Sequence, residues 1–135
     1  MKPLNFIDTN VLVYLLSADA VKAERAESLL ASGDCVVSVQ VLNEFAAVAT
    51  RKLKMSLAEV GEVLGTIRAV CRVAPLTEDV HVLGLRIAEQ YRLSIYDAMI
   101  VASALEAQCP SLWSEDMQNG LKVERKLVVR NPFVQ

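Results

Sequence analysis

Short runs of apolar residues alternate along the chain with longer stretches in which apolar positions recur at helical spacing. The short runs predict strands at residues 4–7, 35–37, 72–74, 111–113 and 127–129. The longer stretches predict helices at residues 11–16, within 18–32, from 39 to about 53, from 56 toward 71, from 77 to about 92 and from 95 to about 107. Alternating strands and helices indicate βαβ units. We therefore expect an α/β fold with three layers, α/β/α, around a mostly parallel central sheet.

Polar residues stand where several of these helices are expected to begin. Ser38, Ser56 and Thr77 are predicted N-caps, and Ser56 with Glu59 three residues later has the spacing of a capping box. Neither a linker nor a repeat interrupts this series. We expect residues 1–135 to form one domain.

Composition narrows the function classes. Hydrophobic residues make up 53% of the chain, enough for a sizeable core, and the net charge is −2. A protein that holds nucleic acid mainly by an overall positive field would be basic, so phosphate contacts here would have to be local or carried by a metal ion. The three cysteines lack a CxxC spacing and are predicted to be buried thiols. The start of the chain does not resemble a secretory signal, and no apolar run approaches the ~18 residues of a membrane span, so a cytoplasmic protein is expected.

Two aspartates come directly after predicted strands. Asp8 follows residues 4–7, and Asp116 follows residues 111–113 after Ser114 and a glutamate. Ligands of parallel α/β sheets bind beyond the carboxyl ends of the strands. Helix capping by Asp8 and turn formation around Asp116 are the competing interpretations. Because Thr9 and Asn10 are equally able to cap, Asp8 is not needed for that purpose. Glu115 is expected to point elsewhere, toward solvent.

Two more carboxylates lie inside apolar helical stretches. Glu44 is the only acid between residues 35 and 55, and such an isolated carboxylate needs a compensating partner, for which a cation is one candidate. Asp97 lies three residues after Ser94, so it belongs either to a second capping box or to a ligand site at a helix N-terminus. Four carboxylates in one cleft would repel each other, which either raised pKa values or a hard divalent cation would relieve. Oxygen ligands without His or Cys favour Mg²⁺ or Mn²⁺ over zinc.

Five fragments in order, "FIDTNVLVYLL", "VLNEF", "LSIYDAMIVASALEAQC", "LWSEDMQNG" and "VVRNPF", resemble the PIN-domain ribonucleases, and more closely the VapC-type toxins of type II toxin–antitoxin pairs. The resemblance implies a PIN-like fold and a catalytic set of Asp8, Glu44, Asp97 and Asp116. Three of these, Asp8, Asp97 and Asp116, would hold Mg²⁺ or Mn²⁺ directly or through water. Glu44 would either ligate the ion or orient the attacking water.

The same resemblance implies supporting residues and partners. The supporting polar positions are Thr9 or Asn10, and Ser114, where the family commonly has Thr. Ser94, the predicted cap beside Asp97, is a further candidate supporting residue. The expected activity is metal-dependent endoribonucleolytic cleavage of RNA. A small antitoxin whose C-terminal segment occupies the cleft, and a second copy in a homodimer, are the expected protein partners. Arg51, Lys52 and Arg125 are candidates to guide the RNA backbone.

Other functions remain open from the residues alone. An RNA-processing PIN nuclease without a toxin role would carry the same acids. A DxD-type phosphatase would need a second Asp where Asn10 stands. A non-catalytic, Mg²⁺-binding receiver-like module would need paired acids after the first strand. A purely structural role for the four acids leaves Glu44 unexplained.

Overall fold

The computed structural model describes residues 3–134, and its centre is a six-stranded sheet with the strand order β3-β2-β1-β4-β6-β5. The strands are β1 (Asn5–Ile7), β2 (Cys35–Ser38), β3 (Arg72–Ala74), β4 (Ser111–Trp113), β5 (Lys122–Val123) and β6 (Leu127–Arg130). All neighbours are parallel except β5, which runs antiparallel to β6. The predicted mostly parallel sheet is confirmed.

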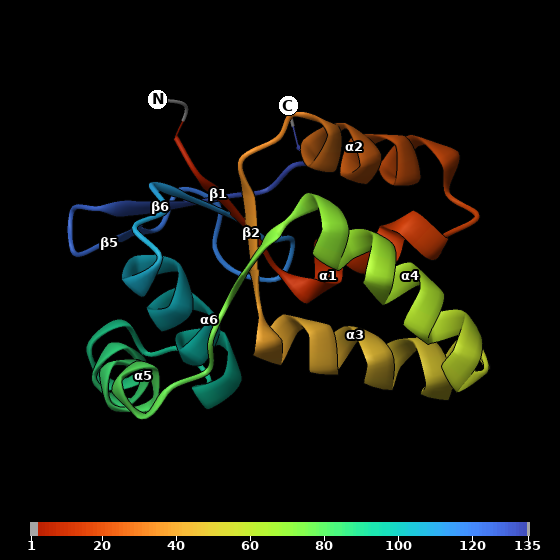
Figure 1. Ribbon diagram of the computed structural model, residues 1–135. Helices are drawn as coiled ribbons and strands as arrows, with labels where there is room; N and C mark the ends of the chain where they lie inside the picture. Colours follow the sequence, from red (N-terminus) through yellow and green to blue (C-terminus); the bar gives the residue numbers. More distant parts are fainter. Residues whose placement is uncertain (1–2, 135) are drawn as a thin grey trace.

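Helices cover both faces of the sheet, as the three-layer prediction requires. They are α1 (Thr9–Leu12), α2 (Ala20–Ala31), α3 (Val39–Arg51), α4 (Leu57–Val70), α5 (Glu78–Tyr91) and α6 (Ile95–Glu106), with a 3₁₀ helix η1 (Val13–Leu16) after α1. Helices α1 to α4 lie on one side of the strands, and α5 and α6 pack together on the other (Figure 1). Within residues 3–134, none of the helices is both long enough and apolar enough to cross a membrane.

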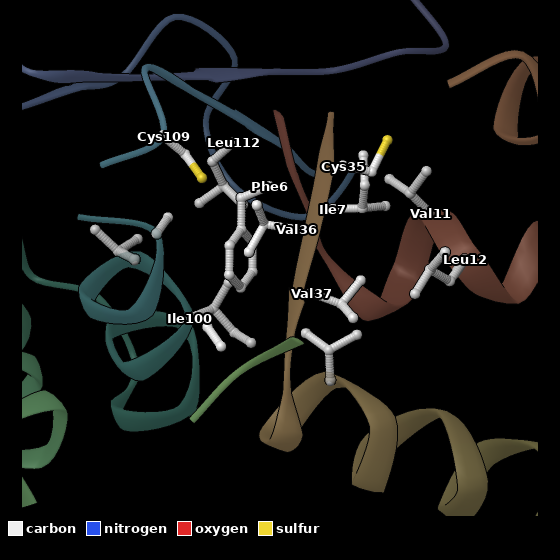
Figure 2. Packing of buried hydrophobic residues seen from close by; sticks show 14 of the residues in the cluster. Phe6, Ile7, Val11, Leu12, Cys35, Val36, Val37, Ile100, Cys109 and Leu112 are labelled. Carbon is white, nitrogen blue, oxygen red and sulfur yellow. The ribbon is translucent and has the colours of Figure 1, made fainter. Parts of the chain in front are cut away.

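Consecutive residues of β1 supply both halves of the core, because side chains alternate across a strand. Figure 2 shows Phe6 pointing toward Ile100 of α6, while Ile7 lies on the opposite side, facing Val11 and Leu12. Phe6 and Ile7 have no exposed surface. Strand β1 is therefore buried on both faces, which explains its continuous apolar sequence.

The predicted N-caps are present. The side-chain oxygens of Ser38 and Thr77 accept the backbone N–H of the residue three positions later, and Ser56 and Glu59 form the reciprocal capping box. The three cysteines are free and buried, as predicted.

One local expectation, on helix capping, was wrong, and one strand was missed. The helix expected at 11–16 is the short α1 followed by η1, and its N-cap is Asp8, whose carboxylate accepts the Thr9 N–H at 2.7 Å. Thr9 and Asn10 therefore do not take over the capping. Strand β5 was missed because two residues show no periodicity; Glu124 and Arg125, both with positive φ, form the turn between β5 and β6.

The strand order places a switch point between β1 and β4. From β1 the chain moves outward through β2 to β3, then returns through α5 and α6 to β4 on the other side of β1. Crossovers that leave in opposite directions open a crevice at the carboxyl ends of the two central strands. Asp8 follows β1 at this crevice, and its N–H donates to the Trp113 carbonyl of β4 at 3.0 Å.

Candidate active site

Asp8 is buried at the crevice, with 3% of its surface exposed. Its Oδ1 accepts the Thr9 N–H at 2.7 Å. Its Oδ2 accepts hydrogen bonds from Ser114 Oγ at 2.9 Å and from Asn10 Nδ2 at 3.1 Å. All three donors are neutral, so no cationic side chain neutralises this carboxylate.

Asn10 ties the two central strand ends together. Its Nδ2 donates to Asp8 and, at 3.2 Å, to Ser114 Oγ, while its Oδ1 accepts the Glu115 N–H at 2.9 Å. The side chain thus bridges residues more than 100 positions apart in the sequence. Both ends of its amide are occupied in holding the crevice in shape.

Glu44 lies on α3, half-buried, and faces the same crevice. Its Oε1 accepts from Thr9 Oγ1 at 2.7 Å, and its Oε2 accepts from Gln40 Nε2 at 3.1 Å. The same Gln40 amide donates to the Tyr96 carbonyl at 3.1 Å, just before Asp97. The partners that Glu44 needs are therefore these two polar side chains. A carboxylate has about four acceptor positions, so further ligands still fit.

Asp97 and Asp116 approach from the other elements. Asp97 is half-buried in the first turn of α6, where Ser94 Oγ accepts its backbone N–H at 3.3 Å. Asp116 is exposed and follows Ser114, whose N–H is fixed by the Arg130 carbonyl at 2.9 Å. The Ser94 hydroxyl caps the helix by accepting the backbone N–H of Asp97, and the side chain of Asp97 lines the crevice.

One cavity of about 800 Å³ joins all four acids. Asp8, Glu44, Asp97 and Asp116 form its acidic end, and Val13, Leu16, Val48 and Leu53 extend it along α3 as an apolar wall. Glu115 also lines it, but is paired outside the cavity with Lys22, and Lys52 is the one cationic side chain among the lining residues. The charge of the four acids is therefore largely uncompensated within the cavity.

The pKa values of Asp8 and Asp97 are raised, first by burial and further by the neighbouring acids. Burial raises the pKa of Asp8 from its ordinary 3.8 to about 6; hydrogen bonds from Ser114 and Thr9 pull that pKa down, and the charges of Asp97 and Glu44 push it up. Burial also raises the pKa of Asp97, with Ser94 opposing and the charges of Asp116 and Glu44 adding to the effect. Both of the alternatives considered from the sequence, raised pKa values and a cation, relieve the same repulsion.

The donor chemistry fits a hard divalent cation. The acidic end offers carboxylate oxygens with neither His nor Cys among the cavity-lining residues, which favours Mg²⁺ or Mn²⁺. As placed, no three His, Cys, Asp or Glu side chains of residues 3–134 converge closely enough to hold a metal ion. Binding such an ion would require the carboxylates to draw together against their mutual repulsion, and the attraction of each carboxylate to the cation would favour that movement.

The basic candidates differ in position. Lys52 lines the far end of the cavity, whereas Arg51, its exposed neighbour at the end of α3, does not. Arg125 lies in the turn before β6, at the edge of the sheet opposite the acids, so the structure does not bring it to the site. A role for Arg125 in guiding a ligand into this cavity is not supported.

Two further features of the site were not predicted from the sequence. Gln40 was overlooked, although it stands four residues before Glu44, the spacing that puts two side chains on one helix face. The prediction that Glu115 points to solvent was wrong: its carboxylate is held by Lys22 at 2.7 Å and by Tyr14 OH at 2.7 Å. Both partners belong to elements remote from it in sequence.

Comparison with known proteins places these features in context. The family model of the PIN domain matches residues 6–119. No curated protein matches the chain. Among solved structures, a toxin–antitoxin complex from Klebsiella pneumoniae is similar with a TM-score of 0.72 and 17% identity, over 96% of this chain and 98% of that chain. VapC20 of Mycobacterium tuberculosis, a toxin that cleaves the sarcin-ricin loop, has a TM-score of 0.68 and 22% identity over 83% and 89%. VapBC2 of Rickettsia felis, bound to a DNA fragment from its promoter, has a TM-score of 0.68 and 15% identity, over 95% of this chain and 98% of that chain.

Proposed function

Because the chain belongs to the PIN domain family, we propose that it is a metal-dependent endoribonuclease and the toxin of a toxin–antitoxin pair. One observation carries the proposal. Asp8, Glu44, Asp97 and Asp116 come from four separate parts of the chain and line one cavity at the switch point of the sheet. That arrangement is typical of a ligand site in α/β proteins.

The four acids would have different roles at the site. Asp8, Asp97 and Asp116 would hold Mg²⁺ or Mn²⁺, and Glu44 would either join them or orient the attacking water. When bound, the ion would supply the positive charge that stabilises charge developing on the phosphate oxygens. Asn10 and Ser114 would keep Asp8 in place, since both donate to its Oδ2. Thr9 and Gln40 would do the same for Glu44.

Direct hydrolysis suits the residues present better than a covalent intermediate. The single histidine, His81, is exposed on α5 and does not line the cavity. A Ser–His or Cys–His pair at this cavity is thus excluded by composition and position. A water molecule is the nucleophile that this carboxylate set can serve.

Two of the alternative functions are supported less well than the nuclease. A DxD-type phosphatase needs a second free carboxylate where Asn10 stands, and both ends of the Asn10 amide hold neighbouring groups. Membership of the PIN family argues against the receiver-like module. An RNA-processing PIN nuclease without a toxin role remains the alternative that an experiment must separate.

The expected partners follow from the family resemblance and the neighbours. Solved structures similar to this chain include toxin–antitoxin complexes, one of them on promoter DNA. We propose a small antitoxin whose C-terminal segment occupies the cavity, RNA as the substrate, and assembly into a homodimer in the cytoplasm. Lys52 would meet the RNA backbone at the far end of the cavity, beside the exposed Arg51.

The activity is tested on purified protein with cellular RNA. Cleavage should require Mg²⁺ or Mn²⁺, stop with a chelator, and disappear in Asp8→Asn and Asp97→Asn. Asp79→Asn makes the same chemical change at an exposed position of α5 outside the cavity, and it should leave cleavage intact. Unchanged cleavage in both cavity variants would mean that the acids have been assigned the wrong role.

The toxin role needs a separate test in cells. Expression of the chain alone should arrest growth, and co-expression of a small protein encoded beside it should restore growth. Asp8→Asn should be harmless when expressed alone. Normal growth with active wild-type enzyme would favour the RNA-processing alternative.

A further inference from the structure

A polar and aromatic network stands directly behind the acidic end of the cavity. Lys22 Nζ of α2 donates to Glu115 Oε2 at 2.7 Å and to Tyr14 OH at 3.1 Å, and Tyr14 OH donates to Glu115 Oε1 at 2.7 Å. The ammonium also lies 4.6 Å from the ring centroid of Tyr14 and 5.0 Å from that of Phe133. These two rings meet edge to face at 4.8 Å. Three separate segments of the chain thus converge on the ammonium group of Lys22.

The network reaches the acids through Glu115. This residue stands between Ser114, which donates to Asp8, and Asp116. Its own N–H donates to Asn10 Oδ1, and Asn10 donates in turn to Asp8. Fixing the Glu115 side chain therefore fixes the segment that carries two residues of the site.

We propose that Lys22 is a positioning residue of the nuclease site, acting through Glu115 to hold residues 114–116 in place. This inference rests on the proposed function. Both carboxylate oxygens of Glu115 are engaged, one by Lys22 and the other by Tyr14, so the Glu115 side chain is fixed at the wall of the cavity. Asp116 is exposed and depends on this segment for its position.

A role in stability alone would not explain the arrangement. The Lys22 and Glu115 side chains are 32% and 27% exposed, and ion pairs at the surface contribute little to folding. The pair does remove flexibility from a short loop whose geometry the site requires. Mutation of groups that orient metal ligands typically lowers metal affinity or activity by about 10–100-fold.

The chain offers a matched control. Arg86 and Glu124 form the other described ion pair, with an N–O distance of 2.6 Å, between α5 and the β5–β6 turn. Neither residue lines the cavity. Arg86→Met therefore removes a comparable pair without touching the site.

The test compares Lys22→Met, Lys22→Arg, Glu115→Met and the double variant Lys22→Met/Glu115→Met with Arg86→Met. Titration calorimetry of Mn²⁺ in the absence of RNA gives ion affinity, kinetics with RNA gives kcat and KM, and thermal unfolding gives Tm. Lys22→Met and Glu115→Met should each weaken Mn²⁺ binding and lower kcat by about tenfold, in the range typical of groups that orient metal ligands. The double variant should be no worse than the poorer single variant, because both break one contact.

Three outcomes decide the matter. The positioning role is supported if Lys22→Arg recovers Mn²⁺ affinity and Arg86→Met keeps the Mn²⁺ affinity of the wild type. If Lys22→Met changes only Tm, as Arg86→Met does, Lys22 is structural and the inference falls while the proposed function stands. If the wild-type protein neither binds Mn²⁺ nor cleaves RNA, the proposed function fails and the inference fails with it.

Discussion

Asp8→Asn should separate the function of this carboxylate from its effect on stability. Burial holds the pKa of Asp8 at about 6, against an ordinary 3.8. In metal-free protein the native state therefore keeps a proton on Asp8 at pH values where the unfolded chain has already lost it. By linkage, the free energy of unfolding then falls as pH rises from about 4 to about 6.

The size of this effect follows from the shift. A difference of about 2 pKa units corresponds to roughly 3 kcal/mol of unfavourable free energy at neutral pH. Asparagine carries no charge and does not have this term, but it cannot accept all three hydrogen bonds that Asp8 receives. Each lost bond costs about 1 kcal/mol. At pH 7 the metal-free variant should therefore be as stable as the wild type, or more stable by about 1–2 kcal/mol.

The assay is urea unfolding of chelator-treated protein at intervals from pH 4 to 7.5, for both proteins. The wild type should lose about 3 kcal/mol more than the variant over that range. Subtracting the two profiles removes the contribution of the remaining acids. Adding Mn²⁺ at pH 7 should stabilise the wild type more than Asp8→Asn, because the variant lacks one of the three carboxylates proposed to hold the ion. Parallel pH profiles for the two proteins would refute the claim that Asp8 is held in a costly ionised state.

Substitutions at four other positions have expected results. Ser114→Ala should reduce cleavage about 10–100-fold, while Ser114→Thr, which retains the hydroxyl, should keep most of it; rates at saturating RNA and Mn²⁺ measure this. Gln40→Leu removes the amide that donates to Glu44 and should lower kcat with little change in Tm, so an equal fall in both would point to packing instead. Gly84→Ala should destabilise the fold by less than about 1 kcal/mol, because the new Cβ meets the flexible end of the Met99 side chain of α6, which can turn aside. Gly61→Ala, whose Cβ meets nothing within 4 Å, should stabilise by up to about 1 kcal/mol in the same urea titration.

The local elements were predictable because their signals are local. Short apolar runs located five of the six strands. Ser and Thr residues directly before helical patterns located the helix starts at Ser38, Ser56 and Thr77. The two-residue β5 was missed, whereas the helix expected at 11–16 is α1 followed by the 3₁₀ helix η1. A strand as short as β5 is defined by its pairing with β6 and leaves no periodic trace in the sequence.

The candidate site was predictable as a set of residues but not as an arrangement. Asp8 and Asp116 follow strands, and Glu44 is an isolated acid in an apolar helix, so their positions make them candidates beside capping and turn roles. The full set of four is what the resemblance to the PIN-domain ribonucleases implies. The meeting of these acids in one cavity depends on β4 pairing with β1 across more than 100 residues. No local pattern encodes that pairing.

The sequence by itself determined the α/β class and the mostly parallel sheet, and it made the four acids candidates for a site of oxygen-only chemistry. Only the tertiary structure decided which neutral groups hold those acids. It made Asp8 both the cap of α1 and the acceptor of three bonds, gave Glu44 the Gln40 amide, and turned Glu115 away toward Lys22. The physical reason is that a buried carboxylate must find its donors in space, and those donors come from whichever segments the sheet order brings alongside.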